Sequence, residues 1–566
     1  MVRNERGYAL ILVLFMIIIF MVLGTAVLSA SIGGATRTET REDDIQSLHL
    51  ADKTLNEAVA YLVSQFDERE DISPDELKLK MSQTALNDMK SKMKTNTDLA
   101  NASAEITDIT LKQPTCVTNC TVVLTAEATV NTTKRTLRQE VSIHSFPEFL
   151  KYAFGSENNV ILNGGVQGMG GSVYAGKELL INNYARYIYK SSPEVRSYRS
   201  IYPQLGLDEE DKIYVQSLDS IKYDIGGTYL KFMNNKGIDE LLGDEVTNDK
   251  IQLRNKKKFV SINVDETFLD KTTEAVGEDK RSAIKNAIEN RNFHSFELAL
   301  GPIATMLPPP VEPKDFSNIV DIENYELAKD AYANQFIDMR DSTLHNGDLD
   351  VNGIDLKKIT YAGDENTRQG KWLIVNGDLN IVNENPDDSK IVISANMLVT
   401  GDVTIRGKVD VDAAIYTLGR TTIEDATIRG LSNGSGGRKQ LIMISKGEIL
   451  INRVDALEND RGNYSEDGKN TLDAFFYTDA SGELYGVGSI FWLHGGFFAK
   501  GDLTINAVRG DVGDDSSDFV FGLQDKSKVP RFVIDYYDQF YEYQYSGLPR
   551  VKQLSVEAGA RRLVPN

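Results

Sequence analysis

Cysteine and histidine, which build most metal and redox sites, are nearly absent from this chain. Its 566 residues include two cysteines and five histidines. None of the histidines belongs to an HExxH metal motif. They are His49, His144, His294, His345 and His494. With so few candidate ligands, we expect no metal site and no cofactor. We also expect no catalytic residue and that the protein is not an enzyme.

Positive charge is also in short supply. The chain carries 62 basic residues against 83 acidic ones, which gives a net charge of −21. Affinity for nucleic acid comes largely from Lys and Arg side chains that neutralise phosphates. We therefore expect no nucleic acid partner, and solubility of a surface protein is the simpler explanation of the acidity.

The two cysteines lie close together in the segment QPTCVTNCT. Cys116 and Cys120 are candidates for a disulfide that closes a small loop in an oxidising compartment. A CxxxC metal pair is the alternative, but no histidine or further cysteine lies nearby to complete four ligands.

A long apolar run near the N-terminus is the most informative feature that is present. Tyr8 to Ala30 form 23 uncharged residues, and a helix needs about 20 to cross a membrane. The basic leader MVRNERG precedes the run, which predicts a cytoplasmic N-terminus and a single-pass protein whose bulk lies outside. The alternative is a secretory signal that is cleaved near residues 28–30.

The region after the run is expected to hold one long helix and a small sheet. We assign 8–35 to a transmembrane helix and 36–146 to its amphipathic continuation followed by antiparallel strands. Apolar residues recur at helical spacing from Ile45 to Phe66. Period-two alternation then predicts strands; they cover 104–111, 121–130 and 136–143. A second helix is expected to begin after the N-cap Ser73.

Short phrases that open with glycine recur through the rest of the chain. NGDLNIVN, TGDVTIRG and KGDLTINA share a glycine, a polar residue and then alternating apolar residues. Recurrence at about 20–30 residues indicates a β-solenoid, in which glycine turns each corner and the aliphatic residues point inward. The expected inward residues are Val403, Ile405, Val409, Val411, Ile415, Ile423 and Ile428. An antiparallel β-sandwich is the alternative.

These patterns divide the second part of the chain. The solenoid is expected to start in 147–184 and to continue in 341–510, with a mixed α/β insertion at 185–340. A tail at 511–566, rich in aromatics, is expected to cap the open end of the coil. The fold class is therefore mainly β, with a long N-terminal α-helix, a small antiparallel sheet and a β-solenoid.

The N-terminus resembles the minor pilins of type IV pili and the pseudopilins of type II secretion, PilX-type minor pilins above all. The match rests on Glu5-Arg6-Gly7-Tyr8-Ala9-Leu10, the apolar run and the acidic pattern that follows, about a tenth of the chain. The resemblance implies a prepilin leader, 1–7, which a membrane peptidase cuts between Gly7 and Tyr8. Leu12 stands where major pilins have glutamate, a departure shared by tip-type members. In texture, the repeats look similar to the glycine-turned solenoids of bactofilin-like and PilX-associated domains.

Three further segments match known motifs in part. Gly171 to Lys177 fits the start of a phosphate-binding loop, but Glu178 replaces the Ser or Thr that holds magnesium, and a strand follows where a helix is needed. Trp492 to Gly496 faintly resembles an oxyanion loop. The acids of the loop 511–518 have oxygen ligands of the kind that calcium prefers, but not the spacing of an EF-hand, and a solvated loop is the simpler reading; they are Asp511, Asp514, Asp515 and Asp518.

The sequence thus favours a minor pilin-like subunit of a pilus, secretion or competence machine. Its expected partners are the membrane, other pilin-like subunits, the prepilin peptidase and a surface ligand of unknown kind. A membrane-anchored surface scaffold that never enters a filament is the second hypothesis. An enzyme acting on glycans, by analogy with solenoid lyases and hydrolases, is the third.

Overall fold

The chain folds into two compact units in the computed structural model. The structure describes residues 6–65, 79–93, 97, 101–112, 119–144, 147–189, 194–232, 236–254, 262–314, 317–385, 389–434, 436–452, 471–537, 544, 547–549 and 555–564. Unit 1 comprises 1–145 together with 552–566, and unit 2 comprises 146–551. Unit 2 is therefore an insertion into the chain of unit 1.

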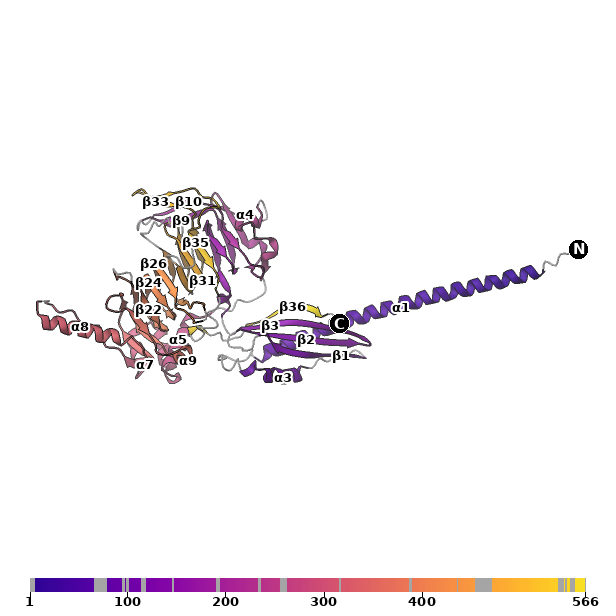
Figure 1. Ribbon diagram of the computed structural model, residues 1–566, viewed down its shortest axis with the longest axis horizontal. Helices are drawn as coiled ribbons and strands as arrows, with labels where there is room; N and C mark the ends of the chain where they lie inside the picture. The colour runs from indigo at the N-terminus through magenta and orange to yellow at the C-terminus, as the bar shows by residue number, and fades with distance from the viewer. Residues whose placement is uncertain are drawn as a thin grey trace. The chain divides into compact units, whose positions relative to one another are not determined.

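Unit 1 packs one long helix against a four-stranded antiparallel sheet of order β1-β2-β3-β36. Figure 1 shows that the C-terminal half of α1 lies along the sheet. The elements are α1 (Arg6–Ser64), α3 (Gln83–Lys92), β1 (Ala102–Leu111), β2 (Asn119–Val130), β3 (Thr133–His144) and β36 (Ser555–Val564). The expected helix and strands are therefore present, and a fourth strand arrives from the C-terminus.

The continuation of α1 is amphipathic, with a core-facing stripe that begins later than its sequence suggested. Ile45 and Leu48 are exposed, and the buried stripe starts at Leu50. It packs on sheet residues such as Leu124 and Val141; its helical members are Leu50, Ala51, Leu55, Ala58 and Leu62. Phe66 and the expected cap Ser73 lie outside the described residues.

Unit 2 is built mainly from strands. Its helices are η1 (Glu148–Lys151), η2 (Leu218–Ser220), α4 (Ile238–Leu242), η4 (Asn248–Lys250), α5 (Val264–Val276), η5 (Glu278–Lys280), α6 (Arg281–Glu289), α7 (Phe293–Leu300), α8 (Ile319–Asn334) and α9 (Glu365–Arg368). Its first strands are β4 (Tyr152–Ser156), β5 (Asn159–Gly164), β6 (Gln167–Met169), β7 (Ser172–Ala175), β8 (Glu178–Asn182), β9 (Tyr184–Ile188), β10 (Val195–Arg199), β11 (Gln204–Gly206), β12 (Ile213–Val215), β13 (Ile221–Ile225), β14 (Thr228–Lys231), β15 (Ile251–Leu253) and β16 (Ala304–Thr305).

The remaining strands come after α8 in the chain. They are β17 (Thr343–Asn346), β18 (Leu349–Val351), β19 (Lys358–Thr360), β20 (Leu373–Asn376), β21 (Leu379–Val382), β22 (Ile391–Ser394), β23 (Met397–Val399), β24 (Val403–Val411), β25 (Ala413–Thr417), β26 (Thr421–Gly430), β27 (Leu441–Ser445), β28 (Ile449–Asn452), β29 (Thr471–Thr478), β30 (Gly482–Gly486), β31 (Phe491–Ala499), β32 (Leu503–Ala507), β33 (Val512–Asp514), β34 (Phe519–Phe521) and β35 (Phe532–Asp535).

Strands of successive coils pair in parallel and in register, which makes unit 2 a three-sided solenoid. The first ladder runs β16-β17-β20-β23-β25-β27-β29-β31-β4-β7-β12-β15. The second runs β18-β21-β24-β26-β28-β30-β32-β5-β8-β13. The third runs β19-β22-β24-β26-β29-β31-β35-β6-β11. All seven residues expected to point inward lie in the buried core between the ladders.

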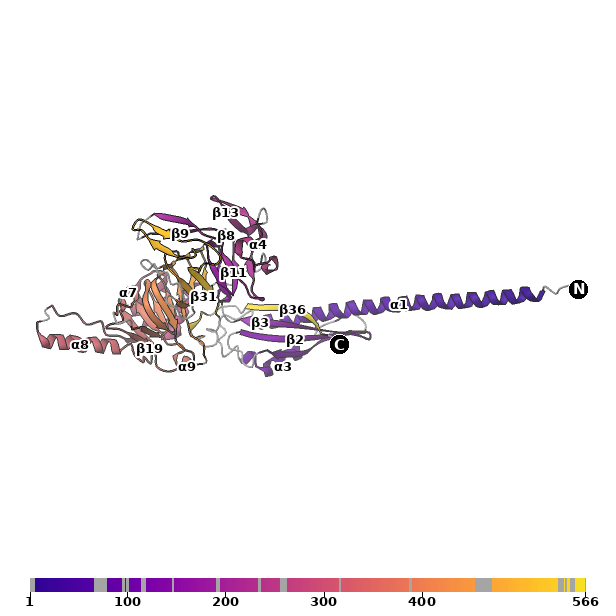
Figure 2. The same cartoon turned by 45° about the horizontal axis from the view of Figure 1, so that its top comes forward.

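The coils do not stack in chain order. The chain enters the solenoid at β4 and winds outward to β15, and α5 to α7 then pack on the outside of the first ladder. A second series of coils starts at β16 and ends with β31, β32 and β35, which pair with β4, β5 and β6. The coil series that is last in sequence thus meets the first in mid-solenoid. Figure 2 shows β11 and β13 at one end of this unit and β19 at the other.

This arrangement differs from the expected boundaries in two places. Strands β11 to β13 and β15 belong to the solenoid, so the region 185–340 is only partly an insertion. The tail 511–566 does not act as a single cap: β35 is a rung of the solenoid, and β36 completes the sheet of unit 1. The strand edges left by β31 and β32 are covered by β4 and β5 instead.

Glycines form a column along one corner of the solenoid. A Cβ at Gly401 would lie 2.7 Å from the carbonyl oxygen of Gly377, and one at Gly419 would lie 2.4 Å from that of Gly401. A Cβ at Gly447 would lie 2.6 Å from the oxygen of Gly419. These contacts are closer than real Cβ atoms allow, so the repeated glycine is required by the coil below it rather than by backbone torsion.

Candidate functional site

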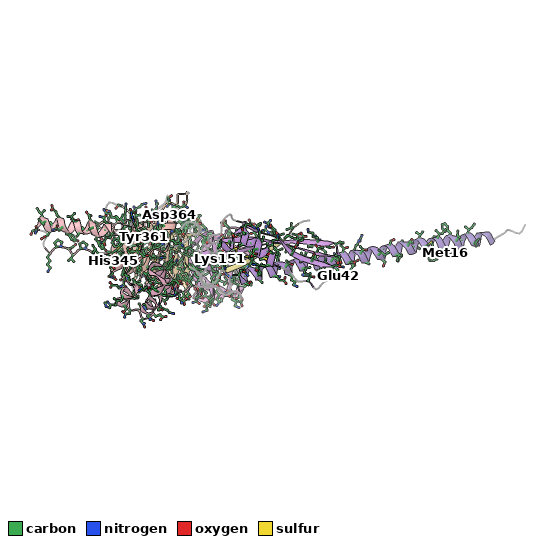
Figure 3. All side chains as sticks on the ribbon, turned by 90° about the horizontal axis from the view of Figure 1, so that it is seen from below. Met16, Glu42, Lys151, His345, Tyr361 and Asp364 are labelled. Carbon is green, nitrogen blue, oxygen red and sulfur yellow. The ribbon has the colours of Figure 1, made fainter. Side chains whose placement is uncertain are left out.

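The N-terminal half of α1 is apolar and uncovered within the chain. Its 17 large apolar side chains between Leu10 and Ile32 are each 41–73% exposed. Figure 3 shows Met16 on the part of α1 that extends beyond the sheet, and Glu42 near the start of the covered part. By length and composition, α1 is the one described helix able to cross a membrane.

Threonine side chains in and just after this segment form hydrogen bonds within the helix. The Thr25 hydroxyl donates to the carbonyl oxygens of Met21 and Val22, at 3.0 and 2.9 Å. Thr36 and Thr38 bond in the same way to residues four earlier. Because these threonine hydroxyls bond to backbone carbonyl oxygens of the same helix, they do not depend on water as a partner.

Small residues line part of the same segment. No described residue comes within 4 Å of a Cβ placed on Gly24, Gly33 or Gly34. Glycine lowers helix stability by about 1 kcal/mol relative to alanine, and nothing within the described chain requires it here. The absence of a side chain at these positions leaves room for another helix to approach closely.

Charged residues fix the rest of α1 on its sheet. Asn131 donates to Asp43 at 2.9 Å, and the guanidinium of Arg135 bonds to Asp44. Arg561 of β36 bonds to Asp52 and, at 2.5 Å, to Asn56. Acidic residues of α1 thus meet basic residues from two strands, including the C-terminal one, and these contacts set the register of helix and sheet.

The expected processing site lies at the start of α1. Gly7 and Tyr8 belong to its first turns, and Met1 to Glu5 lie outside the described residues. The side chain of Tyr8 is also outside the described set. Cleavage between Gly7 and Tyr8 therefore stays a prediction.

The cysteine pair is only partly described. Cys120 lies on β2 and is fully buried in the core of unit 1. Cys116 lies outside the described residues, among which there is no free cysteine. The Cys116–Cys120 disulfide stays a prediction.

The acidic loop after Asp511 forms the turn of the hairpin β33–β34, and its carboxylates already have partners. Asp518 accepts from Tyr187 at 3.0 Å and pairs with Arg196 at 3.0 Å. Asp514 accepts from Tyr189, and Asp515 accepts from Ser517 and the Asp518 amide. Within the described residues, no group of three or more acids, histidines or cysteines is arranged to hold a metal ion.

A buried polar cluster on the solenoid was not foreseen from the sequence. Asp412 accepts from Arg368 at 2.9 Å, Lys439 at 2.6 Å and Gln544 at 3.3 Å. The cavity beside it holds about 10 Å³, room for roughly one water molecule. Asp412 therefore joins Arg368, Lys439 and Gln544, and a cavity of this size is too small for a sugar.

A second acid beside this cluster is likewise occupied. Asp473 accepts from the Gly430 amide at 2.8 Å and faces the Nδ1 atom of His494 at 3.2 Å. The ring of His494 lies 4.3 Å from that of Tyr537, whose hydroxyl donates to the Arg438 carbonyl. These contacts hold together segments from 430 to 537, which no sequence motif connects.

One short motif was also missed in the sequence. Gly430 to Gly434 (GLSNG) has the spacing of a GxSxG nucleophile elbow. That elbow requires a helix after the serine, whereas Ser432 bridges to Arg438 and the strand β27 follows. The glycine-rich segment before Lys177 is likewise followed by the strand β8, so neither motif has the backbone its chemistry needs.

The comparisons with known proteins give little beyond this geometry. No protein-family model and no curated protein matches the chain. Among solved structures it is similar to the competence-associated pilin ComZ from Thermus thermophilus, at 14% identity over 92% of this chain and 98% of that chain, with a TM-score of 0.26. A TM-score this low supports no argument, so the proposals below rest on the residues of this chain.

Proposed function

We propose that this chain is a non-enzymatic minor pilin-like subunit of a bacterial type IV pilus or a related pilus, secretion or competence machine. Its first helix is stored in the cell membrane with the N-terminus in the cytoplasm, and then packs against the helices of other subunits. The glycine-turned solenoid stands outside the cell and serves assembly initiation, adhesion or surface interaction. The resemblance of the leader to PilX-type minor pilins and pseudopilins supports this assignment.

One observation carries the proposal: a single helix has an uncovered apolar half and a half that is built into a folded unit. Each large apolar side chain gains roughly 1.5–3 kcal/mol on full burial. Seventeen such side chains are exposed between Leu10 and Ile32, while Leu55 and Leu62 are fully buried. The first half therefore needs lipid or other helices around it, and the second half orients unit 1 rigidly with respect to the first.

The glycines favour helix partners over lipid alone. A helix anchored only by lipid gains nothing from Gly33 and Gly34, because lipid tails adapt to any surface. A packed helix bundle uses small residues to bring backbones close together. The two glycines, unneeded by the described chain, fit such a bundle.

N-terminal sequencing of the mature protein tests the processing step. We expect a start at Tyr8 in cells that carry the prepilin peptidase and at Met1 in cells that lack it. A start near Ser31 would indicate ordinary signal cleavage and would contradict the proposal. An intact leader in both strains would favour the alternative, a membrane-anchored surface scaffold outside any filament.

A pair of variants tests the packing step. Gly34→Leu places a large side chain where nothing in the described chain is displaced, so unit 1 should fold normally. We expect the variant to reach the membrane but to be depleted at least about fivefold from the sheared filament fraction, a loss of roughly 1 kcal/mol in assembly. Val27→Leu, at a site already large and 69% exposed, is the matched control. Equal incorporation of the two variants into the filament fraction would contradict the filament role.

A further inference from the structure

Two hairpins form a lobe on the side of the solenoid. The hairpin lobe consists of β9–β10 and β33–β34. Its rings interlock: Tyr198 stacks on Phe521 at 3.8 Å, and Tyr187 lies 5.3 Å from Phe519. Arg196 pairs with Asp518 across the two hairpins. The lobe therefore has its own core, and one of its sides faces the solenoid strands.

A groove of about 300 Å³ lies between the hairpin lobe and the outward faces of β26, β28 and β30. This volume is at the lower bound of small-molecule sites, roughly 300–1,000 Å³. One wall of the groove belongs to the hairpin lobe and consists of Tyr187, Ile188 and Phe519. The other wall belongs to the solenoid and consists of Glu424, Leu450, Asn452, Glu483, Tyr485, Val487 and Gly488. None of these residues takes part in the role proposed for α1.

Parallel register explains how the solenoid wall is assembled. Glu424 lies opposite Asn452 on neighbouring coils, and Leu450 lies opposite Glu483. Outward side chains of successive coils therefore form rows, and each row presents one polar or apolar group per coil. A ligand with a repeating backbone would run along such rows.

The polar groups of the groove are mainly acceptors. The buried Oδ1 atom of Asn452 has no hydrogen-bond partner among the described residues. Glu424 forms no ion pair with a described residue, and Glu483 lies close enough to Tyr485 to influence its hydroxyl. Burial, and then the nearby Glu483 carboxylate, raises the pKa of Tyr485 above its usual range. A ligand must therefore supply donors, while Nδ2 of Asn452 can also meet an acceptor.

We propose that this groove binds a short stretch of a neutral oligosaccharide. Sugar hydroxyls both donate to Glu424 and accept from Asn452, and the apolar ring faces pack on Tyr485 and Phe519. Two carboxylates repel uronates, sulfated glycans and nucleic acid. An ammonium group, which only donates, would leave the amide donors of Asn452 unused. The groove lies entirely in unit 2, so the proposed sugar binding and the proposed filament role are independent of each other.

Calorimetry on the full chain tests the proposal. The protein is kept in lauryldimethylamine oxide, whose headgroup carries no sugar, and is titrated with maltohexaose, cellohexaose, chitohexaose and mannohexaose. We expect at least one to bind with a Kd below about 1 mM and hexagalacturonate not to bind. Tyr485→Ala should weaken that binding at least about tenfold, and Glu424→Gln at least about threefold. Tyr229→Ala, at an exposed tyrosine elsewhere on unit 2, and Glu448→Gln, at an exposed acid, should leave it unchanged.

Three outcomes overturn the proposal. It fails if none of the four hexaoses binds, if Glu424→Gln binds the hexaose as tightly as the natural chain does, or if hexagalacturonate or a trilysine peptide binds as tightly as the best of the four. Glu424→Gln keeps the size of the side chain, so it decides the matter even if Tyr485→Ala unfolds. Failure here with a mature start at Tyr8 would leave the filament role standing.

Discussion

At the scale of single residues, Glu157 sits where the two coil series meet. Its amide donates to the carbonyl oxygen of Ala499 at 3.0 Å, and its buried Oε1 atom has no hydrogen-bond partner among the described residues. Burial raises the pKa of Glu157 to about 7, partly offset by Lys500. The folded protein therefore holds a proton that the unfolded chain, with a pKa near 4.5, has released.

The sign of this shift gives a testable pH dependence. The folded state is favoured by this group below about pH 4.5, and that advantage is lost as the pH rises toward 7. Glu157→Gln cannot ionise, so we expect it to melt at a higher temperature than the natural chain at pH 8 and at the same temperature at pH 4. Differential scanning calorimetry at both values measures the difference. A constant offset across the pH range would show that the raised pKa is not involved.

Asp473 offers a second residue-scale prediction. Replacing it with alanine removes the acceptor of the Gly430 amide and the partner of the buried His494 ring. We expect a loss of about 1–3 kcal/mol in the stability of unit 2. Thermal unfolding, compared with Asp330→Ala at an exposed position of α8, measures it. Equal stability of the two variants would mean that water replaces the carboxylate.

At the scale of elements, the sequence predicted what repeats locally and missed what depends on stacking. Alternation at Val403 and Ile405 and the glycines at 401 and 419 revealed the coil, because each coil imposes the same contacts. The pairing of β32 with β5 could not be predicted from the sequence, because any two solenoid ends of matching shape can pair. The cluster around Asp412 was hidden for the same reason, since its members from Arg368 to Gln544 meet only in three dimensions.

The glycine column yields a prediction for the coil as an element. Gly419→Ala would place a Cβ 2.4 Å from the carbonyl oxygen of Gly401, so the two coils must separate locally. We expect unit 2 to lose about 1–3 kcal/mol, as in other overpacked sites. Gly513→Ala, whose Cβ would meet nothing closer than 3.9 Å, should be neutral. Chemical denaturation of the two variants tests this, and equal midpoints would show that the column is not a steric requirement.

At the scale of the whole molecule, the solenoid is an insertion between two adjacent strands of one sheet. The chain leaves unit 1 after β3 and returns to pair β36 with β3. Both connections of unit 2 therefore lead to neighbouring strands, and Arg561 of β36 also bonds to α1 at Asp52. A mechanical force on the solenoid is therefore distributed over β3 and β36 and transmitted to α1. We propose that this helix packs into the filament.

Ending the chain at Val551 tests whether the returning strand matters. The truncation removes β36 and exposes the edge of β3, whereas the described strand pairs of unit 2 all lie within 146–551. We expect hydrogen exchange to rise by at least about tenfold in Thr136–His144 and to stay unchanged in Leu441–Ser445. A synthetic peptide of residues 555–564 should restore protection, because it supplies the missing ladder. Unchanged exchange in β3 would mean that a three-stranded sheet is sufficient, and faster exchange in both segments would show that the two units unfold together.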